Sequence, residues 1–162
     1  MLVRYFMTTN PVCVNSGTSV RRAAEIFLAS GIGDIMVIDD NARLVGVLSD
    51  TDLLREIMPT PEEVVTPDGS IIDAMVCFEE KGIALANCSI DQFVEKQPLV
   101  VSPRDKIFYG ATILLGHQIR CIPVVDDNRL IGTLSVKDIS SGIFAPSIPG
   151  NIGASHGLRY FT

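Results

Sequence analysis

The sequence predicts an α/β (α+β) protein built from two tandem β-α-β-β-α repeats related by a pseudo-twofold axis. Residues 5–41 align without a gap over residues 92–128, and residues 43–52 align over residues 129–138. The two blocks share 18 identities in 47 aligned positions, where ordinary composition gives roughly 3 by chance. Proline and glycine residues also recur at matching places. One supersecondary unit is therefore present twice in the chain.

The most similar stretch of the two repeats is residues 35–52 and its counterpart, residues 122–138. Each copy contains an apolar strand, a polar turn with the triplet Asp-Asp-Asn, and a second apolar strand. Each copy ends in Ser-x-x-Asp, a pattern that often starts a helix. The repeat unit therefore ends with a strand, a turn, a strand and a helix start.

The first repeat begins with a predicted strand at residues 12–14, which Asn10 and Pro11 lead into in an extended conformation. A helix is expected at residues 19–30, with Gly31 ending it. The expected buried face of this helix consists of Val20, Ala23, Ala24 and Phe27, which follow the helical period.

Two strands at residues 35–39 and 44–48 complete the predicted sheet of the first repeat. Ser49 or Asp50 should then cap a helix that continues to about Met58. The predicted order is strand, helix, strand, strand, helix.

The second repeat has the same predicted order. It starts with a strand at residues 99–101, followed by a helix that Pro103 enters. A short final helix follows Asp138, because Gly142 and Pro146 interrupt it. The expected buried face of the first of these helices consists of Ile107, Gly110, Ala111 and Leu114.

A spacer and a tail lie outside the two repeats. The opening of the spacer, residues 59–69, is expected to be irregular and partly exposed. Ser70 and Asp73 then have the spacing of a helix N-terminus, and the next helix has an apolar face of Ile71, Met75 and Phe78.

Composition limits the classes of protein to which this chain can belong. Its 162 residues are 47% hydrophobic, enough for a packed core, but no apolar run approaches the 20 or so residues of a membrane span. The N-terminus has no pattern of a secretory signal, so a cytoplasmic location is expected. The net charge of −6 and the scattered Lys and Arg residues disfavour nucleic-acid binding.

The four cysteines, Cys13, Cys77, Cys88 and Cys121, include no C-x-x-C pair. They are interpreted as structural thiols, with Cys13 and Cys121 inside apolar strands. His117 and Cys121 are four residues apart, but a helix should end between them. No metal site is therefore predicted.

Both repeats resemble the CBS domain, the motif first noticed in cystathionine beta-synthase. In the first repeat the resemblance is carried by residues 7–14, 32–39 and 44–52, and in the second by residues 94–138. The Ile-Pro-Val-Val-Asp strand of the second repeat is closer to the family pattern than its counterpart. The resemblance implies that the two motifs pack through their sheets as a pseudo-twofold pair, often called a Bateman module.

On this basis the chain is a stand-alone CBS-domain protein whose two motifs form one globular module. CBS motif 1 takes residues 1–58, a spacer with one helix takes residues 59–88, and CBS motif 2 takes residues 89–146. A flexible tail takes residues 147–162. Such pairs commonly dimerise, and the apolar helix faces also favour a homodimer.

The resemblance implies a regulatory module that binds an adenosyl compound, such as AMP, ADP, ATP or S-adenosylmethionine, in clefts between the motifs. No cofactor is required, and an unidentified protein target would be a further partner. An Asp in the first turn of a helix can accept hydrogen bonds from ribose hydroxyls, and the helix N-terminus can bind phosphate. In the family this Asp works with the first strand of the other motif, so Asp138 should face residues 10–15 and Ile35, and Asp52 should face residues 97–102 and Ile122. The expected ligand-binding residues are Asp138, Ser135, Lys137, Arg120, Thr133, Asn10, Cys13, Asn15, Ile35, Asp52, Ser49, Val100, Ile122 and Pro123.

The two clefts are predicted to be unequal, with the better nucleotide site at Asp138. Lys137 stands beside Asp138 where the first repeat has Thr51, and Arg120 precedes the second-repeat strand where the first repeat has Gly33. These cations would favour phosphate.

One alternative to a nucleotide site remains open. The Ser-x-x-Asp motifs equally suit ordinary helix starts, and the module would then be a dimerisation or protein-interaction scaffold without a nucleotide. Met36 stands where the family usually has proline, and Asp34 and Asp50 put negative charge beside a cleft, which would repel phosphate. An enzyme is not predicted, because there is no glycine-rich phosphate loop and no nucleophile with a base beside it.

Overall fold

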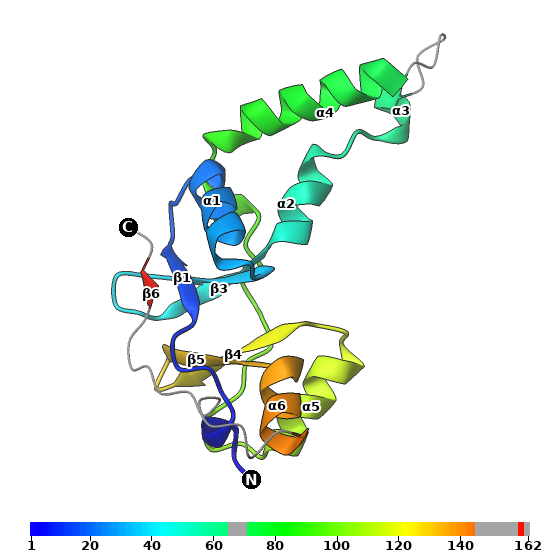
Figure 1. Cartoon of the computed structure of the whole chain (residues 1–162). Coiled ribbons are helices and arrows are strands. Elements are labelled where there is room, and N and C mark those ends of the chain that lie inside the picture. The colour runs from blue at the N-terminus through cyan, green and yellow to red at the C-terminus, as the bar shows by residue number, and fades with distance from the viewer. Residues whose placement is uncertain (65–70, 145–158, 161–162) are drawn as a thin grey trace.

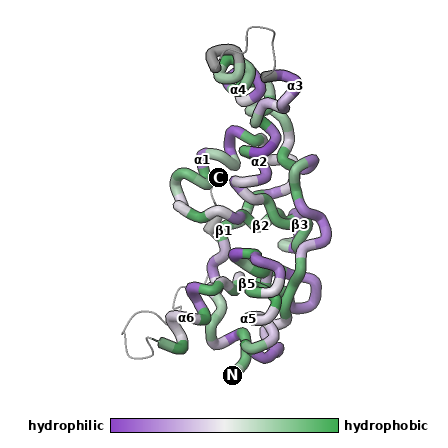
Figure 2. The backbone as a smooth tube through the Cα atoms, turned by 90° about the vertical axis from the view of Figure 1, so that its right-hand side faces the viewer, coloured by the Kyte–Doolittle hydropathy of each residue, from purple (hydrophilic) through white to green (hydrophobic). Residues whose placement is uncertain are grey.

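Two α/β halves are stacked sheet to sheet in the computed structural model, which describes residues 1–64, 71–144 and 159–160 (Figure 1). The helices of each half lie on the outside of the stack, and the strands of both halves lie at its centre (Figure 2). The predicted α/β fold class with two repeats is confirmed. Among the described residues, no helix is both long and apolar enough to cross a membrane.

The first half contains a sheet with strand order β3-β2-β1-β6. Strands β1 and β2 are parallel, β2 and β3 are antiparallel, and β6 adds to β1 in parallel. Its elements in chain order are β1 (Val12–Asn15), α1 (Val20–Ser30), β2 (Asp34–Ile38), β3 (Leu44–Ser49) and α2 (Asp50–Ile57), with β6 (Arg159–Tyr160) from the far end of the chain.

Helix α1 has the caps that its sequence predicts. The Ser19 hydroxyl accepts a hydrogen bond from the Arg22 N–H at 3.2 Å. At the other end, Gly31 adopts φ 66°, and its N–H donates to the Phe27 carbonyl. This left-handed conformation carries little cost for glycine, which therefore ends the helix.

The buried face of α1 is rotated from the predicted one. Val20, Ala23 and Ile26 are buried, Phe27 is partly buried, and Ala24 is exposed. The buried residues of α1 are spaced three positions apart, so the helix turns Ile26 toward the sheet and leaves Ala24 in solvent.

The second half contains α5 (Ile107–Gly116), β4 (Cys121–Asp126), β5 (Arg129–Ser135) and α6 (Val136–Phe144). Strands β4 and β5 pair antiparallel. The predicted helix after Pro103 begins only at Ile107, because residues 102–105 form a turn in which the Ser102 N–H donates to Asp105 at 2.7 Å.

The predicted strand at residues 99–101 is wrong, since only Val101 pairs, in an isolated parallel bridge with Val124. Pro98 and Pro103 flank this segment and have no N–H to donate to a ladder, which limits strand pairing to its middle.

The segment before each repeat crosses to the other half. Thr8 exchanges two backbone hydrogen bonds with Thr133 of β5, at 2.8 and 2.9 Å. Glu95, which occupies the position of Thr8 in the repeat alignment, exchanges two with Val47 of β3, at 2.9 and 3.1 Å. The two halves are thus interlocked through their leading segments.

Apolar anchors hold the crossed segments in place. Val3 is fully buried in the hydrophobic cluster of the second half, and Ile90 is fully buried in that of the first half. A third cluster joins the two sheets and contains Cys13, Met36, Ile38 and Leu130. Each half therefore contributes side chains to a core that it shares with the other.

The spacer is more helical than the sequence predicts. A short helix, α3 (Pro61–Val64), lies within the part that was expected to be irregular, and α4 (Ile71–Ala86) follows. Helix α4 packs against α1, α2 and α3 and projects beyond the first half (Figure 1). The predicted cap at Ser70 lies outside the described residues, and Met75 is 60% exposed, so this helix buries less than its apolar pattern suggests.

The end of the chain is only partly described. Residues 147–158 and 161–162 of the predicted flexible tail lie outside the described residues. Arg159 and Tyr160 form β6, which pairs with Val12 and Cys13 of β1. At least these two residues of the tail therefore have a partner in the sheet.

Candidate ligand-binding cleft

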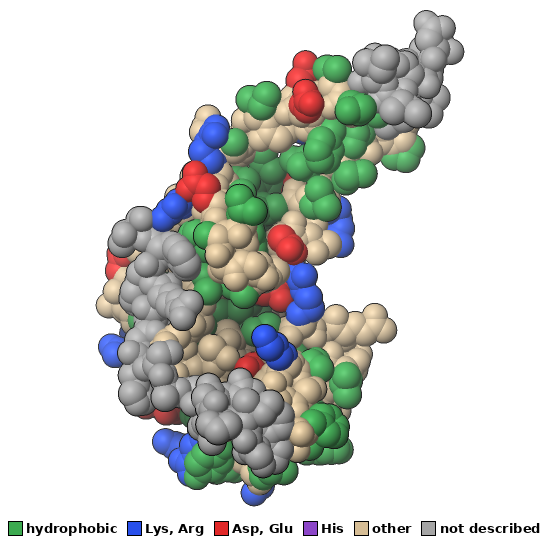
Figure 3. Space-filling model, viewed as in Figure 1, with side chains coloured by type: hydrophobic (Ala, Val, Ile, Leu, Met, Phe, Trp, Pro, Cys, Tyr) green, Lys and Arg blue, Asp and Glu red, His purple; other side chains and the backbone are tan. Residues whose placement is uncertain are grey.

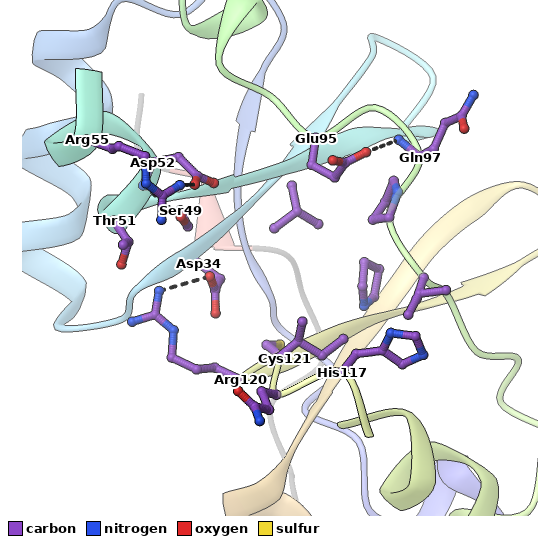
Figure 4. Close-up of a pocket in the computed structure, with 16 residues that line it drawn as sticks. Asp34, Ser49, Thr51, Asp52, Arg55, Glu95, Gln97, His117, Arg120 and Cys121 are labelled. Carbon is purple, nitrogen blue, oxygen red and sulfur yellow. Dashed lines mark hydrogen bonds and ion pairs between the residues drawn. The ribbon is translucent and has the colours of Figure 1, made fainter. Parts of the chain in front are cut away.

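A cleft of about 600 Å³ opens between the two halves. Its walls come from the end of β3 and the start of α2, from the crossed segment before the second repeat, and from the stretch that joins α5 to β4 (Figure 4). The lining residues are Asp34, Val47, Ser49, Thr51, Asp52, Arg55, Glu95, Gln97, Pro98, Leu99, His117, Gln118, Ile119, Arg120, Cys121 and Pro123.

Ser49 and Asp52 lie together at one wall of this cleft. The Ser49 hydroxyl caps α2 by accepting a hydrogen bond from the Asp52 N–H at 3.0 Å. The Asp52 carboxylate accepts from the Arg55 guanidinium at 2.9 Å through Oδ1, and its side chain is 42% exposed. The carboxylate is thus held at the cleft and accessible to a ligand.

Arg120 ties the second half to the first across the cleft. Its Nη2 donates to the Asp34 carboxylate at 3.2 Å, to the Asp50 carboxylate at 3.0 Å and to the Gly33 carbonyl at 3.0 Å. Burial raises the pKa of Asp34 above its ordinary value, and the nearby Arg120 charge opposes that shift. The side chain of Asp34 is only 16% exposed, so its ion pair with Arg120 is partly shielded from water.

The sequence predicts Arg120 at the cleft of Asp138, whereas in the structure its guanidinium pairs with carboxylates of the first half. The side chain of Arg120 reaches the two carboxylates of the first half and lines the cleft of Asp52. Lys137 is exposed and lies with Ser135 in a separate hollow of about 410 Å³, which Arg120 also borders. The attraction of two carboxylates explains why the guanidinium turns toward the first half.

Asp138 is more heavily hydrogen-bonded than Asp52. Its Oδ1 accepts from the Thr8 hydroxyl at 3.0 Å. Its Oδ2 accepts from the Ser135 N–H at 2.7 Å and from the Ser135 hydroxyl at 2.6 Å. Both carboxylate oxygens therefore hold the start of α6 and the crossed N-terminal segment.

The halves on either side of the cleft correspond to a known domain. Comparison with protein families matches residues 3–59 and 90–144, more than half of the chain, to the CBS domain. The chain belongs to the CBS domain family. Its two CBS motifs are the two halves that meet at the cleft.

Relatives and solved structures agree with a CBS pair. The chain is 32% identical over 138 residues to the chloroplastic CBS domain-containing protein CBSX2 of Arabidopsis thaliana, covering 80% of this chain and 58% of that protein. A crystal structure of CBSX2 matches with a TM-score of 0.73 at 29% identity, covering 88% of this chain and 94% of the other. A structure of CBSX2 in complex with AMP matches with a TM-score of 0.68 at 29% identity, covering 88% and 96%.

A more distant match shows the same fold. It is the CBS domain pair of protein MJ0100 in complex with 5′-methylthioadenosine and S-adenosyl-L-methionine, with a TM-score of 0.62 at 20% identity, covering 86% of this chain and 97% of that one. The chain spans only 24–40% of the length of three further curated relatives, which are 21–23% identical. One of these is a homoserine O-acetyltransferase of Methanocorpusculum labreanum. This chain therefore matches only a part of each of these longer relatives.

Ile35 and Ile122 do not line the CBS cleft with their side chains. Both are fully buried in the hydrophobic clusters between sheet and helices, which corrects the expectation that they contact a ligand. Successive side chains of a strand point to opposite faces, so Asp34 and Cys121 face the cleft instead. The predicted strands therefore lie at the cleft, but the side chains of Ile35 and Ile122 are on the opposite face of their strands.

Cys13 is also unavailable to a ligand. It is 1% exposed in the cluster between the two CBS sheets, and burial raises the pKa of its thiol to about 12. Burial likewise raises the pKa of Cys121 to about 12, although this residue lines the cleft and a hydrogen bond with the Thr133 side chain acts in the opposite direction. Both stay protonated at neutral pH, as expected of structural thiols. The described residues contain no cluster of three or more side chains that could hold a metal ion.

The remaining predicted residues are dispersed. Asn15 lies at the far end of β1 beside Ile38, where its carbonyl accepts from the Thr18 hydroxyl at 2.7 Å. Val100 is 44% exposed and outside the lining of the cleft, and Asn10 is half-buried just before β1. The predicted set that the structure brings together at one cleft is Ser49, Asp52, Arg120 and Pro123.

Glu95 is the main cleft residue that sequence reasoning missed. Its carboxylate accepts from the Gln97 N–H at 2.9 Å, and Glu95 lies on the same side of the cleft as Asp52, with Arg120 and His117 on the other side (Figure 4). The available signal was the repeat alignment, which places Glu95 over Thr8. The crossing of the segment that carries it could not be read from residue spacing.

Proposed function

We propose that this chain is a regulatory module that binds an adenosyl compound in the cleft containing Asp52. The observation that carries the proposal is a cleft between two CBS motifs with an accessible aspartate, Asp52, in the first turn of the helix at its wall. The structure of CBSX2 with AMP, at 29% identity, supports the adenosyl class of ligand. In this proposal the chain acts without a catalytic role, and its cytoplasmic location stays a prediction.

The shape and lining of the cleft suit a nucleoside. Its volume of about 600 Å³ lies within the range of small-molecule sites. Pro98, Leu99 and Pro123 offer apolar surface for a base, from both the crossed segment and β4. Asp52 can accept hydrogen bonds from the two hydroxyls of a ribose. Base and sugar therefore each have a matching part of the wall.

We assign the primary site to Asp52 in place of Asp138. Asp138 already accepts three hydrogen bonds, so it would have to release Thr8 or Ser135 before it could accept from both hydroxyls of a ribose. Asp52 would only have to share its carboxylate with Arg55, whose side chain is 71% exposed. Exposed ion pairs of this kind are weak, so the exchange is inexpensive in free energy.

Asp52→Asn is expected to weaken adenosine binding roughly 10- to 100-fold, because a hydrogen bond to a charged group contributes about 1.5–3 kcal/mol. Isothermal titration calorimetry with adenosine measures this difference. Asp138→Asn is the matched control, with the same chemical change in the equivalent helix turn, and should leave the affinity within about threefold. Equal losses in both variants would contradict the assignment to Asp52. A parent protein that binds no adenosyl compound would instead support the scaffold alternative.

We further propose a homodimer that forms through the outer helices. An apolar groove of about 610 Å³ runs between α1, α2 and α4, and Leu28 and Leu54 beside it are 88% and 49% exposed. Hydrophobic side chains gather over these helices in Figure 3. Phe108 and Leu115 of the second motif are 79% and 70% exposed. A symmetric dimer would remove both surfaces from water.

Leu28→Glu should convert this dimer into a monomer of 17.5 kDa, because a charge would have to be buried without a partner. Light scattering coupled to size exclusion at micromolar concentration reports the mass. Arg104→Glu, which changes an exposed residue outside the groove, should leave the dimer intact. A parent protein that elutes as a monomer at these concentrations would overturn the proposal.

A further inference from the structure

The charge of the Asp52 cleft is unusual for a site that would receive phosphate. Three carboxylates, of Asp34, Asp52 and Glu95, are among its lining residues. Asp50 forms an ion pair with the same guanidinium as Asp34. A phosphate in this space would face several negative charges at short range.

The cations of the cleft are already engaged. Arg55 pairs with Asp52 at 2.9 Å, and Arg120 pairs with both Asp34 and Asp50. These are the only Lys and Arg residues among the described lining of the cleft. A phosphate would have to detach one of them from its carboxylate, and that carboxylate would then stand unpaired in the same cleft.

The second motif shows that this acidity is particular to one side. In the repeat alignment, Glu95 corresponds to Thr8. Asp34 corresponds to Cys121, whose thiol stays protonated. Arg120 corresponds to Gly33. Each of these charged residues therefore has an uncharged counterpart in the other repeat, so the acidity of the Asp52 cleft is not a general feature of the repeat unit.

We propose that the Asp52 cleft selects adenosyl ligands with a cationic 5′ substituent, such as a sulfonium or an amine, and rejects those with a 5′ phosphate. The inference rests on the proposed function, because it assumes that the adenosine part binds in this cleft. Asp52 holds the ribose, and Asp34 and Glu95 provide the negative field that the 5′ group meets. The cation of the ligand adds to the ion-pair network of the cleft without displacing Arg120.

A series of adenosine compounds that differ in the charge of the 5′ group tests this selectivity. The probes are 5′-amino-5′-deoxyadenosine, adenosine and AMP, titrated calorimetrically into the full chain at pH 7 and low salt. The amine should bind about tenfold more tightly than adenosine, and AMP at least tenfold more weakly. Raising the salt to about 0.5 M should reduce the differences in affinity among the three probes, since screening weakens the interactions between exposed charges.

Glu95→Gln identifies the source of the selectivity, because it removes one charge and keeps an acceptor for the Gln97 N–H. The ratio of amine affinity to AMP affinity should fall about tenfold in this variant. Glu79→Gln, at an exposed position of α4 remote from the cleft, makes the same charge change and should leave the ratio unchanged. AMP binding as tightly as the amine, or equal ratios in the two variants, would overturn the inference while the proposed function stands. If none of the three probes binds, the proposed function itself fails.

Discussion

Gly46→Ala and Gly132→Ala are each expected to lower the free energy of unfolding by about 2–3 kcal/mol, as overpacked positions do. A Cβ at Gly46 would overlap the Glu95 carbonyl oxygen and the Val94 side chain. A Cβ at Gly132 would lie 2.6 Å from the Thr8 carbonyl oxygen. At each glycine the nearest obstacle is a backbone carbonyl oxygen of a crossed segment, which cannot rotate away as a side chain would.

Urea denaturation, monitored by circular dichroism, measures this change in the free energy of unfolding. Gly82→Ala is the matched control, because a Cβ there meets no atom within 4 Å inside α4. It should raise the stability by up to about 1 kcal/mol, since alanine is the better helix former. If the Gly46 and Gly132 variants were as stable as the parent, the close contact between the crossed segments and the opposite sheets would be disproved.

Leu48→Ala and Leu134→Ala should each cost about 2–5 kcal/mol, the usual range for a fully buried leucine. The two residues occupy equivalent positions in the two motifs, and both are 0% exposed. In both variants unfolding should remain a single transition, because Val3 and Ile90 anchor each motif in the core of the other. A change in one motif is therefore expected to destabilise both.

Calorimetry tests the single transition through the agreement of calorimetric and van't Hoff enthalpies. Val100→Ala, at a position that is 44% exposed, should cost less than about 1 kcal/mol. Two resolved transitions in either leucine variant would show that the motifs unfold independently.

Local patterns in the sequence were sufficient to predict most elements of the fold. Ser19 and Ser49 accept the predicted capping hydrogen bonds, and Gly31 has the left-handed conformation expected of a helix end. These features depend on neighbouring residues only, so the sequence contains all the information that they need. The repeat shows the same pattern at a second place in the chain, which supports each predicted element a second time.

The candidate site was harder to predict, because its residues meet through long-range contacts. The alternation in β2 and β4 identified Ile35 and Ile122 as strand residues without showing which face turns to the helices. The two carboxylate partners of Arg120 are 70 and 86 positions away in the chain, and its long side chain can reach either cleft. Glu95 enters the cleft only because its segment crosses to the other half.

The crossed leading segments make this chain the covalently joined equivalent of a domain-swapped dimer. A single repeat separated from the other would carry a 3-10 turn, which begins with Val3 or Ile90 and has no core of its own to enter. It would also expose the β3 or β5 edge that Glu95 or Thr8 now pairs. Two copies of one repeat could satisfy both needs by exchanging these segments. The duplication in the sequence is therefore consistent with an ancestor that paired with itself, and fusion of two copies then allowed each cleft to acquire its own charges.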